Sequence, residues 1–379
     1  MCRKYISRSA ALQAAGGARV RPVWGAPVPL ASSLVGDPSG RQSMKVLITG
    51  GAGFIGSHLA DMLLAHGHEV RVLDAMVTQV HGGSSRPEYI NPGVEFMMGD
   101  VRDANVVRAA LYGIDAVYHF AALVGVGQSM YEVAEYTSVN SWGTAVLMEA
   151  LAKRPVQKLV VASSMSVYGE GHWHMGTSIS TSETYPPGLP NVYALTKYDQ
   201  ERMCLLVGEA SGIPTTALRF FNVYGPRQAL SNPYTGVIAI FASRLLNDRP
   251  PLIYEDGLQS RDFVSVHDIV QACVLALGPT VTGVFNVGTG VATTVLQVAR
   301  TLAEVLGKDI APRFTGTKRI GDIRHCFADI GKARRLLGYE PHVTLEDGLV
   351  ELAEWLQGQK PTDSVERAAR ELTARGLAV

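Results

Sequence analysis

A glycine-rich turn after a short apolar run constrains the fold of this chain more than any other feature. Residues 45–49 (KVLIT) suit a buried parallel strand, and the following pattern GGAGFIG leads into a predicted helix. A side chain in such a turn would hold the backbone away from a bound pyrophosphate, whereas the N–H groups of a helix N-terminus attract that anion. The sequence therefore predicts a dinucleotide site whose turn residues are Gly50, Gly53, Phe54, Ile55 and Gly56.

An acidic residue follows the second predicted strand. Residues 69–73 form this strand, and Asp74 stands at its carboxyl end. A carboxylate at that point accepts hydrogen bonds from a ribose 2′-hydroxyl and repels a 2′-phosphate, which favours NAD as the cofactor. A tight strand-to-helix turn without a ligand is the alternative interpretation.

Strands and helices alternate along the chain from Met44 onwards. Strands are predicted at 45–49, 69–73, 94–98, 116–120, 158–162 and 215–220, and helices at 54–66, 103–112, 131–153, 193–211, 293–306 and 331–337. This rhythm indicates an α/β fold of the Rossmann type, a doubly wound parallel sheet with helices on both faces. Ligands bind such sheets outside the carboxyl ends of the strands, so we expect the active site there.

The pattern changes after Pro226, where prolines become frequent and the elements become shorter. We expect an NAD-binding domain over residues 44–226, to which elements of the C-terminal part return. A smaller region over residues 227–357 is expected to bind mainly the substrate. Residues 358–379 are expected to form a C-terminal tail with a loosely attached helix.

The first 43 residues differ from the rest of the chain. Residues 1–43 hold six basic residues and the single acid Asp37, and are rich in Ala, Gly, Pro and Ser. Such a composition cannot bury enough apolar surface to order the chain, so we expect a disordered extension. A basic targeting peptide is the alternative.

Charge and cysteine usage exclude several kinds of partner. The chain has 34 basic and 34 acidic residues, without a basic stripe for nucleic acid or an apolar run long enough to span a membrane. Its four cysteines lie far apart, which predicts free thiols in a reducing, cytoplasmic location. His172 and His174 have no third ligand nearby in the sequence, so an exposed loop is predicted here and no metal site.

Tyr193 and Lys197 stand one helical turn apart and face the same side of a predicted helix. A lysine ammonium beside a phenol, near a cationic nicotinamide, lowers the pKa of the phenol and prepares it to take a proton from a sugar hydroxyl. Ser164 follows the strand at 158–162 and is expected to bond the same substrate oxygen. A chance Tyr–Lys spacing and a serine-rich turn are the alternatives.

Several ordered motifs together resemble the extended short-chain dehydrogenase/reductase family, in particular its nucleotide-sugar epimerases and dehydratases. The resemblance covers about residues 44–357. It is carried by TGGAGFIG (49–56), GDVRD (99–103), HFAAL (119–123), SSMSVYG (163–169), YALTK (193–197), RFFNVYGPR (219–227) and RDFVSVHD (261–268). Many members pair through two long helices, here predicted at 131–153 and 193–211, so the resemblance implies a homodimer.

The resemblance also implies roles for individual residues. Besides the glycine turn, it implies cofactor contacts for Asp74, Asp100, Val101, Phe120, Ala121, Ala122, Ser163, Tyr193 and Lys197. It implies contacts with a nucleotide-diphosphate sugar for Ser164, Asn222, Arg261, Arg319 and Cys326. Guanidinium groups suit a diphosphate because they pair with phosphate bidentately. For Cys326, a buried apolar position is the alternative.

Two residues separate the reactions that the resemblance allows. Related 4,6-dehydratases carry an Asp-Glu pair before Val-Tyr-Gly, and decarboxylases usually carry a Glu, whereas this chain has Met165 and Ser166. Neither serves as a strong acid or base. The resemblance therefore implies an NAD-dependent 4-epimerase of a dTDP- or UDP-hexose, which oxidises C4, rotates the 4-keto sugar and reduces it again. A related dehydratase, decarboxylase or dehydrogenase, and a non-catalytic NAD-binding sensor, stay as alternatives.

The natural sugar is left open by the sequence. Residues 125–136, 229–247 and 319–330 are similar to bacterial members assigned as dTDP-L-rhamnose 4-epimerases, and the general pattern is also that of UDP-glucose 4-epimerases. Segment 172–190 departs from the first subgroup because it is short and free of cysteine. This loop is expected to border the sugar pocket, so its departure affects the choice of sugar.

Overall fold

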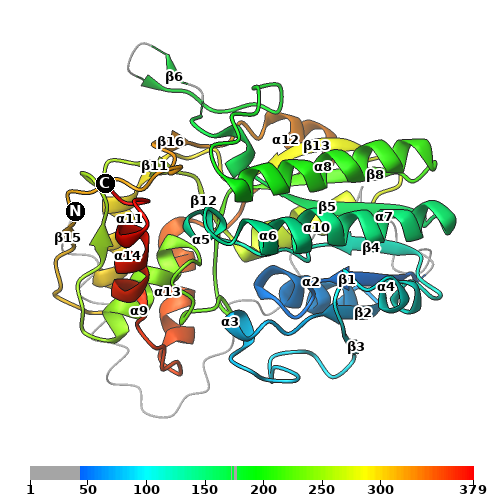
Figure 1. The fold of residues 1–379 in the computed structure, drawn as a ribbon, viewed down its shortest axis with the longest axis horizontal. Helices are drawn as coiled ribbons and strands as arrows, with labels where there is room; N and C mark the ends of the chain where they lie inside the picture. The colour runs from blue at the N-terminus through cyan, green and yellow to red at the C-terminus, as the bar shows by residue number, and fades with distance from the viewer. Residues whose placement is uncertain (1–42, 172, 175–176) are drawn as a thin grey trace. The chain divides into compact units, whose positions relative to one another are not determined.

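Seven parallel strands form a central sheet in the computed structural model, which describes residues 43–171, 173–174 and 177–379. Their order across the sheet is β13-β8-β5-β4-β1-β2-β3 (Figure 1). The strands are β1 (Lys45–Thr49), β2 (Glu69–Asp74), β3 (Glu95–Met98), β4 (Ala116–His119), β5 (Lys158–Ser164), β8 (Thr215–Phe220) and β13 (Gly283–Val287). The chain order reverses at β1, which pairs with β2 and β4 and creates a topological switch point for a ligand. The predicted Rossmann-type fold class is confirmed.

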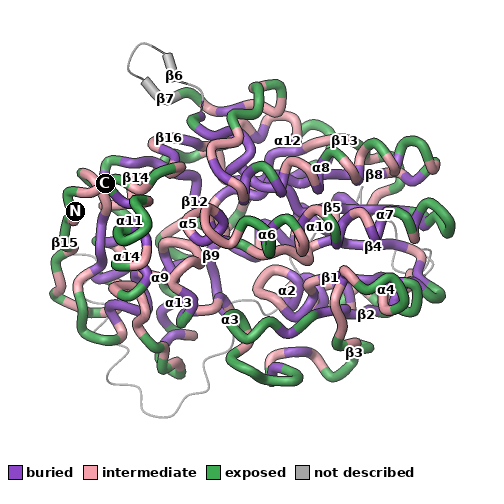
Figure 2. The backbone as a smooth tube through the Cα atoms, in the orientation of Figure 1, coloured by how far each residue is buried: buried purple, intermediate pink, exposed green. Residues whose placement is uncertain are grey.

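The inner strands are buried on both faces, as their continuous apolar sequences require. Along β1, Val46 and Ile48 pack into one core, and Leu47 between them packs into the core on the opposite face. The first face carries α2 (Phe54–Ala65), α10 (Val266–Ala276) and α12 (Gly331–Leu337), and the second carries α4 (Ala104–Ala110), α7 (Gly143–Lys153) and α8 (Val192–Ala210). Figure 2 shows the buried strands between helices with exposed outer sides.

Strand β13 belongs to the sheet although it comes from the part of the chain after Pro226. It pairs in parallel with β8, from Gly283 opposite Thr216 to Val287 opposite Phe220. It was not among the predicted strands. Residues 44–379 form one compact unit, within which the later part of the chain completes the sheet and then adds a second core.

The single helix predicted at 131–153 is wrong, because the structure divides it into three parts. These are α6 (Val133–Tyr136), a π-helical segment (Thr137–Trp142) and α7. Within the π segment, Asn140 is fully buried: its Oδ1 accepts the N–H of Leu123 at 2.8 Å, and its Nδ2 donates to Thr196 Oγ1 at 3.0 Å. The wider turn thus positions a buried amide between a cavity loop and α8.

The C-terminal region packs around its own apolar core. Helices α9 (Val237–Leu246), α11 (Val295–Val305) and α13 (Leu345–Leu356) enclose this core. Short strands complete the region: β9 (Asn222–Tyr224) with β12 (Phe263–Ser265), β10 (Leu252–Ile253) with β15 (Arg313–Phe314), and β11 (Ser260–Arg261) between β14 (Thr293–Thr294) and β16 (His325–Cys326). These elements stand beside the carboxyl ends of the sheet strands and form the second wall of a cleft.

The C-terminal tail is firmly packed, and the loose attachment predicted for it is wrong. Helix α14 (Val365–Ala374) buries Ala368 and Leu372, which lie one turn apart on one face. Beyond the helix, Ala378 forms an antiparallel bridge with Arg319. Apolar burial and backbone pairing therefore tie the last residues to the rest of the unit.

The remaining short elements are loops with one or two turns of helix or a small hairpin. They are α3 (Thr78–His81), α5 (Val126–Ser129), a 3-10 turn (Met165–Tyr168) and the strands β6 (Trp173–His174) and β7 (Thr177–Ser178). The disordered extension predicted for residues 1–43 lies outside the described residues, apart from Ser43, and so does His172. Among the helices that the structure describes, none is long and apolar enough to cross a membrane.

Candidate active site

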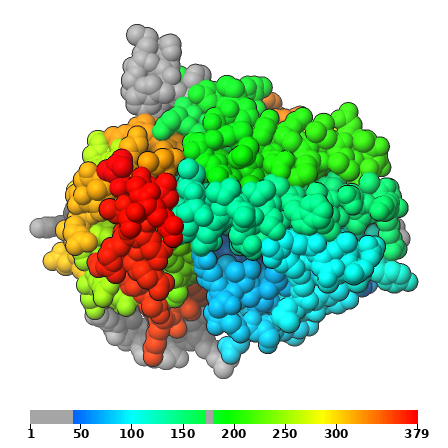
Figure 3. All heavy atoms as spheres, in the orientation of Figure 1, coloured from blue at the N-terminus to red at the C-terminus, as the bar shows by residue number. Residues whose placement is uncertain are grey.

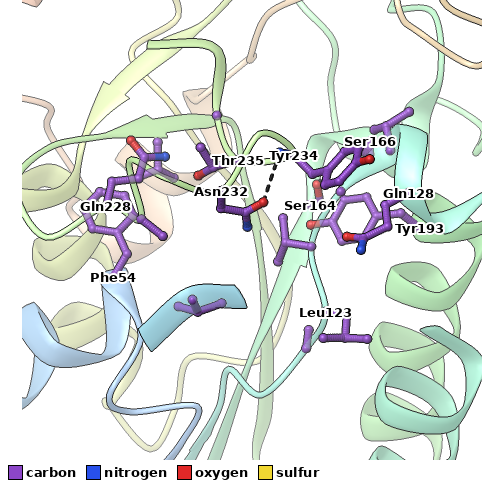
Figure 4. Close-up of a pocket in the computed structure, with 18 of the residues that line it drawn as sticks. Phe54, Leu123, Gln128, Ser164, Ser166, Tyr193, Gln228, Asn232, Tyr234 and Thr235 are labelled. Carbon is purple, nitrogen blue, oxygen red and sulfur yellow. Dashed lines mark hydrogen bonds between the residues drawn. The ribbon is translucent and has the colours of Figure 1, made fainter. Parts of the chain in front are cut away.

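One large cavity lies at the carboxyl ends of the sheet strands, bounded on its other side by the C-terminal region. Its volume is about 720 Å³, within the usual range for small-molecule sites. It brings together every predicted site residue except Cys326: Gly50, Gly53, Phe54, Ile55, Gly56, Asp74, Asp100, Val101, Phe120, Ala121, Ala122, Ser163, Ser164, Tyr193, Lys197, Asn222, Arg261 and Arg319. Figure 4 shows Ser164, Ser166 and Tyr193 gathered on one side of it.

The glycine-rich turn has no room for side chains. Gly50 has a φ of +69°, and a Cβ added to it would lie 2.7 Å from the backbone nitrogen of Ala121. A Cβ on Gly56 would come within 2.6 Å of the backbone at the start of the same turn. Gly53 is the N-cap of α2, without a side-chain hydrogen bond, and the first turn of this helix lines the cavity. The turn therefore fits a dinucleotide pyrophosphate.

Asp74 is fixed at the end of β2 by its neighbours. Its Oδ2 accepts the N–H of Ala52 at 3.0 Å, its Oδ1 accepts the N–H of Met76 at 2.9 Å, and His81 Nε2 lies 3.5 Å from Oδ1. The carboxylate thus stands beside the glycine turn at the cavity wall. This position is compatible with the predicted ribose contact, which stays a prediction.

Asp100 lies at the same end of the cavity but already has a cationic partner. Its Oδ2 accepts from Arg102 Nη2 at 2.7 Å. Burial opposes ionisation of this carboxyl, but the hydrogen bonds from Arg102 prevail and lower its pKa. Asp100 is therefore held as a carboxylate, and its predicted contact with adenine remains a prediction.

Tyr193, Lys197 and Ser164 meet on the opposite side of the cavity. Tyr193 and Lys197 lie on one face of α8, and Ser164 ends β5. The hydroxyl groups of Tyr193 and Ser164 are hydrogen-bonded, and Ser164 Oγ also donates to Ser166 Oγ at 3.2 Å. The N–H of Tyr193 donates to Ser129 Oγ at 3.0 Å, which anchors the start of α8 to α5.

Burial shifts the pKa values of both Tyr193 and Lys197. Burial raises the pKa of Tyr193, and the hydrogen bond with Ser164 only partly opposes that rise. Lys197 Nζ donates to Gln200 Oε1 at 2.7 Å, and burial lowers the pKa of its ammonium to about 8. In the protein alone, desolvation of the phenol dominates. The predicted lowering of the pKa of Tyr193 concerns a site that also holds the cationic nicotinamide, and it stays a prediction.

Two arginines share one carboxylate at the other end of the cavity. Asp322 accepts from Arg319 Nη2 at 2.6 Å and from Arg261 Nη2 at 3.2 Å. Burial opposes ionisation of Asp322, but both cations lower its pKa. Asn222 Oδ1 is buried at the cavity wall and has no hydrogen-bond partner among the described residues. This group offers cations and a vacant acceptor to a polar ligand, as the sequence predicted for three of its four members.

Cys326 is not among the residues that line the cavity, and its predicted contact with substrate stays a prediction. It is fully buried in β16, and its thiol contacts Thr181 Oγ1 at 3.9 Å. Burial raises the pKa of this thiol to about 12, so it behaves as a small apolar residue. Its burial is compatible with the alternative interpretation, a buried apolar position.

Sequence reasoning missed two polar groups that shape the site. Gln79 Nε2 donates to Gln128 Oε1 and to Asn232 Oδ1, both at 3.0 Å, and thus links three loops at the cavity wall. Beneath the serine turn, Glu201 accepts from Ser163 Oγ at 2.6 Å and forms a buried ion pair with Arg219. Single polar residues carry no pattern in the sequence, so only their positions in the fold connect them.

No candidate metal site is found in the part of the chain that the structure describes. Among residues 43–171, 173–174 and 177–379, no group of three or more His, Cys, Asp or Glu side chains could hold a metal ion. The side chain of His174 lies outside the described parts. The sheet, the glycine turn and the cavity define a Rossmann-type protein built to bind a dinucleotide.

The chain belongs to the NAD dependent epimerase/dehydratase family, which matches residues 46–288. A dTDP-L-rhamnose 4-epimerase of Burkholderia thailandensis is 35% identical, over 82% of this chain and 94% of that protein. A UDP-N-acetyl-alpha-D-glucosaminuronate decarboxylase of Bacillus cytotoxicus is 32% identical, over 83% and 98%. The crystal structure of a UDP-glucose 4-epimerase from Thermus thermophilus in complex with NAD is 36% identical, covers 84% of this chain and 100% of that chain, and superposes with a TM-score of 0.75. The family resemblance and the NAD cofactor are confirmed.

Proposed function

We propose that the protein is an NAD-dependent nucleotide-sugar 4-epimerase that acts on a dTDP- or UDP-hexose. The observation that carries the proposal is the meeting of Tyr193, Lys197 and Ser164 at one side of a cavity that also holds Arg261 and Arg319. The first three residues suit proton transfer at a sugar hydroxyl, and the two arginines suit a diphosphate. The 4-epimerases among the relatives support the same reaction.

Each group has a defined task in this reaction. Tyr193 takes the proton of the C4 hydroxyl, and Ser164 bonds the same oxygen. NAD⁺ held at the glycine turn would accept the C4 hydride and later return it. Arg261 and Arg319 fix the diphosphate, and Asn222 Oδ1 accepts from a substrate hydroxyl. The 4-keto sugar then turns about its bond to the diphosphate and presents its other face.

The neighbours of Ser164 favour epimerisation over the alternative reactions. Met165 and Ser166 follow it, are buried and line the cavity. Loss of water from the 4-keto sugar needs a general acid and base, which neither side chain supplies. The Glu that related decarboxylases usually carry before Val-Tyr-Gly is replaced by Ser166. A related dehydratase, decarboxylase or dehydrogenase, and an NAD-binding sensor without turnover, are the competing functions.

A direct assay separates these functions. The purified protein is tested by absorbance for NAD(H) and then incubated with UDP- and dTDP-sugars, whose products are followed by mass and retention time. An unchanged mass with shifted retention supports epimerisation, a loss of water or carbon dioxide supports the alternatives, and no conversion supports the sensor. Tyr193→Phe should lower kcat by roughly two orders of magnitude while NAD remains bound. Tyr198→Phe, in the same helix but outside the cavity lining, is the control.

A homodimer formed through α7 and α8 and a cytoplasmic location stay proposals from the sequence. The two helices lie side by side (Figure 1), and Trp142, Leu195 and Leu206 on or beside them are more than half exposed. By contrast, Leu147 and Met148 are buried within the chain. A C2 pairing would cover the exposed apolar side chains. The mass in solution, compared with that of Leu195→Lys, tests the dimer.

A further inference from the structure

Helix α14 forms an apolar wall of the cavity. Its residues Val365, Ala368, Ala369 and Leu372 line the cavity. Their spacing of three, one and three residues places them on one face of the helix. Ala368 and Leu372 are 5% and 4% exposed. None of these side chains carries a polar atom, so a ligand group beside them gains no hydrogen bond there.

One end of this wall stands next to the reacting group. The side chain of Leu372 packs so closely on α5 that a Cβ on Gly127 would lie 3.0 Å from Leu372 Cδ2. Two residues further along α5, Ser129 accepts the N–H of Tyr193. In the space-filling view, the red C-terminal segment lies against the blue-green segment that includes α5 (Figure 3). The wall therefore reaches the side of the cavity where Tyr193 lies.

The C-terminal segment, residues 360–379, ends at the side of the cavity where the two arginines lie. The N–H of Val379 donates to the carbonyl of Lys318 at 2.9 Å, and the N–H of Ile320 donates to the carbonyl of Leu377, also at 2.9 Å. These bonds bracket Arg319, one of the two arginines proposed for the diphosphate. The stretch from Leu372 to Val379 thus connects the side of the cavity near α8 with the side near Arg319. In the proposed reaction, the glycosyl ring of a nucleotide sugar lies between these two sides.

Ion pairs show that the segment is a built part of the fold. Asp363 accepts from Arg244 at 3.2 Å and from Arg249 at 3.0 Å, and the side chains of Asp363 and Arg244 are only 3% and 1% exposed. Tyr234 donates to Glu371 at 2.8 Å. Without this segment the buried guanidinium of Arg244 would lose its carboxylate partners, which is costly.

This chain is longer than a relative with the same fold. The whole Thermus thermophilus chain is matched by 84% of this chain, and the unmatched remainder is longer than residues 1–43. Some part of residues 44–379 therefore has no counterpart there. The family resemblance covers about residues 44–357 and ends before the segment begins.

We propose that residues 360–379 are a specificity-determining wall that selects a neutral glycosyl group, with Leu372 as its central contact. The inference rests on the proposed function. A carboxylate placed against the four apolar side chains would lose its water without a partner, whereas a hydroxymethyl or methyl substituent can turn an apolar edge towards them. The wall therefore favours hexosyl and 6-deoxyhexosyl nucleotides over hexuronosyl nucleotides.

The test compares Leu372→Ala with Thr373→Ala, whose side chain is exposed and does not line the cavity. Both variants keep the ion pairs and the chain end, and thermal melting checks that both fold. KM and kcat are measured for UDP-glucose, a dTDP-6-deoxyhexose and UDP-glucuronic acid. The wild type should prefer a neutral sugar by at least about 10-fold. Leu372→Ala should raise KM for neutral sugars about 10-fold, with a smaller change in kcat, and reduce that preference. Thr373→Ala should behave as the wild type.

Binding of UDP alone separates a contact with sugar from a general structural effect. Because the wall faces the glycosyl group, Leu372→Ala should leave the Kd of UDP unchanged in calorimetry. A wild-type preference for UDP-glucuronic acid, an unchanged KM in Leu372→Ala, or an equal loss of UDP binding would each overturn the proposal. If the wild type converts no sugar, the proposed function fails. The wall is then judged by the Kd values of the three nucleotide sugars, which should follow the same order.

Discussion

Replacing Glu201 by glutamine removes the countercharge of a buried guanidinium. Glu201 and Arg219 are 1% and 4% exposed, and two hydrogen bonds of 2.8 and 2.6 Å join them. Without the carboxylate, the guanidinium of Arg219 still has the carbonyl oxygen of Glu183 at 3.5 Å from Nη1 and the ring centroid of Tyr168 at 4.7 Å from Cζ. Leaving one partner of such a pair unpaired costs about 3–5 kcal/mol. Glutamine preserves the volume and one acceptor, so we expect a cost at the lower end of that range, about 3 kcal/mol.

The loss is large enough to measure as a melting temperature. An unfolding entropy of roughly 2.1 cal/mol/K per residue, summed over residues 44–379, gives about 0.7 kcal/mol per degree. Glu201→Gln should therefore lower Tm by about 4 °C in scanning calorimetry. The double variant Glu201→Gln with Arg219→Met leaves no unpaired charge and should regain most of this loss. A fall below about 1 °C in the single variant, or additive losses in the double variant, would refute the argument.

Two further predictions concern the cofactor turn and the lysine. Gly50→Ala should lose bound NAD(H), measured by absorbance, because its Cβ would meet Ala121, whereas Gly113→Ala has a similar φ of +73° but open space and should retain it. Retention in both variants would contradict the steric argument. The wild-type kcat should fall above pH 8, where Lys197, with a pKa lowered to about 8, loses the charge that supports the Tyr193 phenolate. Lys197→Met should show low activity without that alkaline decline, and a persisting decline would assign it to another group.

The sheet was predictable because its signals are local and strong. The run at 45–49 is largely apolar and glycines follow it directly. Strand β1 has the same bounds in the structure. The helix predicted at 131–153 failed because an apolar pattern does not reveal the extra residue in a π turn. Strand β13 was not predicted, because five residues in a proline-rich region show little periodicity.

The site was predictable where a motif fixes the backbone and was missed where contacts are distant. Tyr193 lies in a predicted helix and Ser164 follows a predicted strand. Both positions could therefore be inferred from the order of these elements along the chain. Asp322, which pairs with both arginines, has no signal of its own in the sequence. The burial of Cys326 has no signal in the sequence either, because the sequence does not reveal which residues pack around it. Burial in the fold, which a sequence does not display, also decided the pKa of Tyr193.

The position of α14 has a consequence for how the protein is made. A chain emerges from the ribosome with its N-terminus first, and N-terminal parts generally fold before later ones. Strand β13, the last strand of the central sheet, precedes α14 by nearly eighty residues, so the nucleotide-binding half can mature while the segment that encloses the cavity is still unsynthesised. After α14, Val379 pairs with Lys318. Completion of the cavity therefore waits for α14 and the residues after it, and a nascent chain that lacks them has no finished compartment for a sugar.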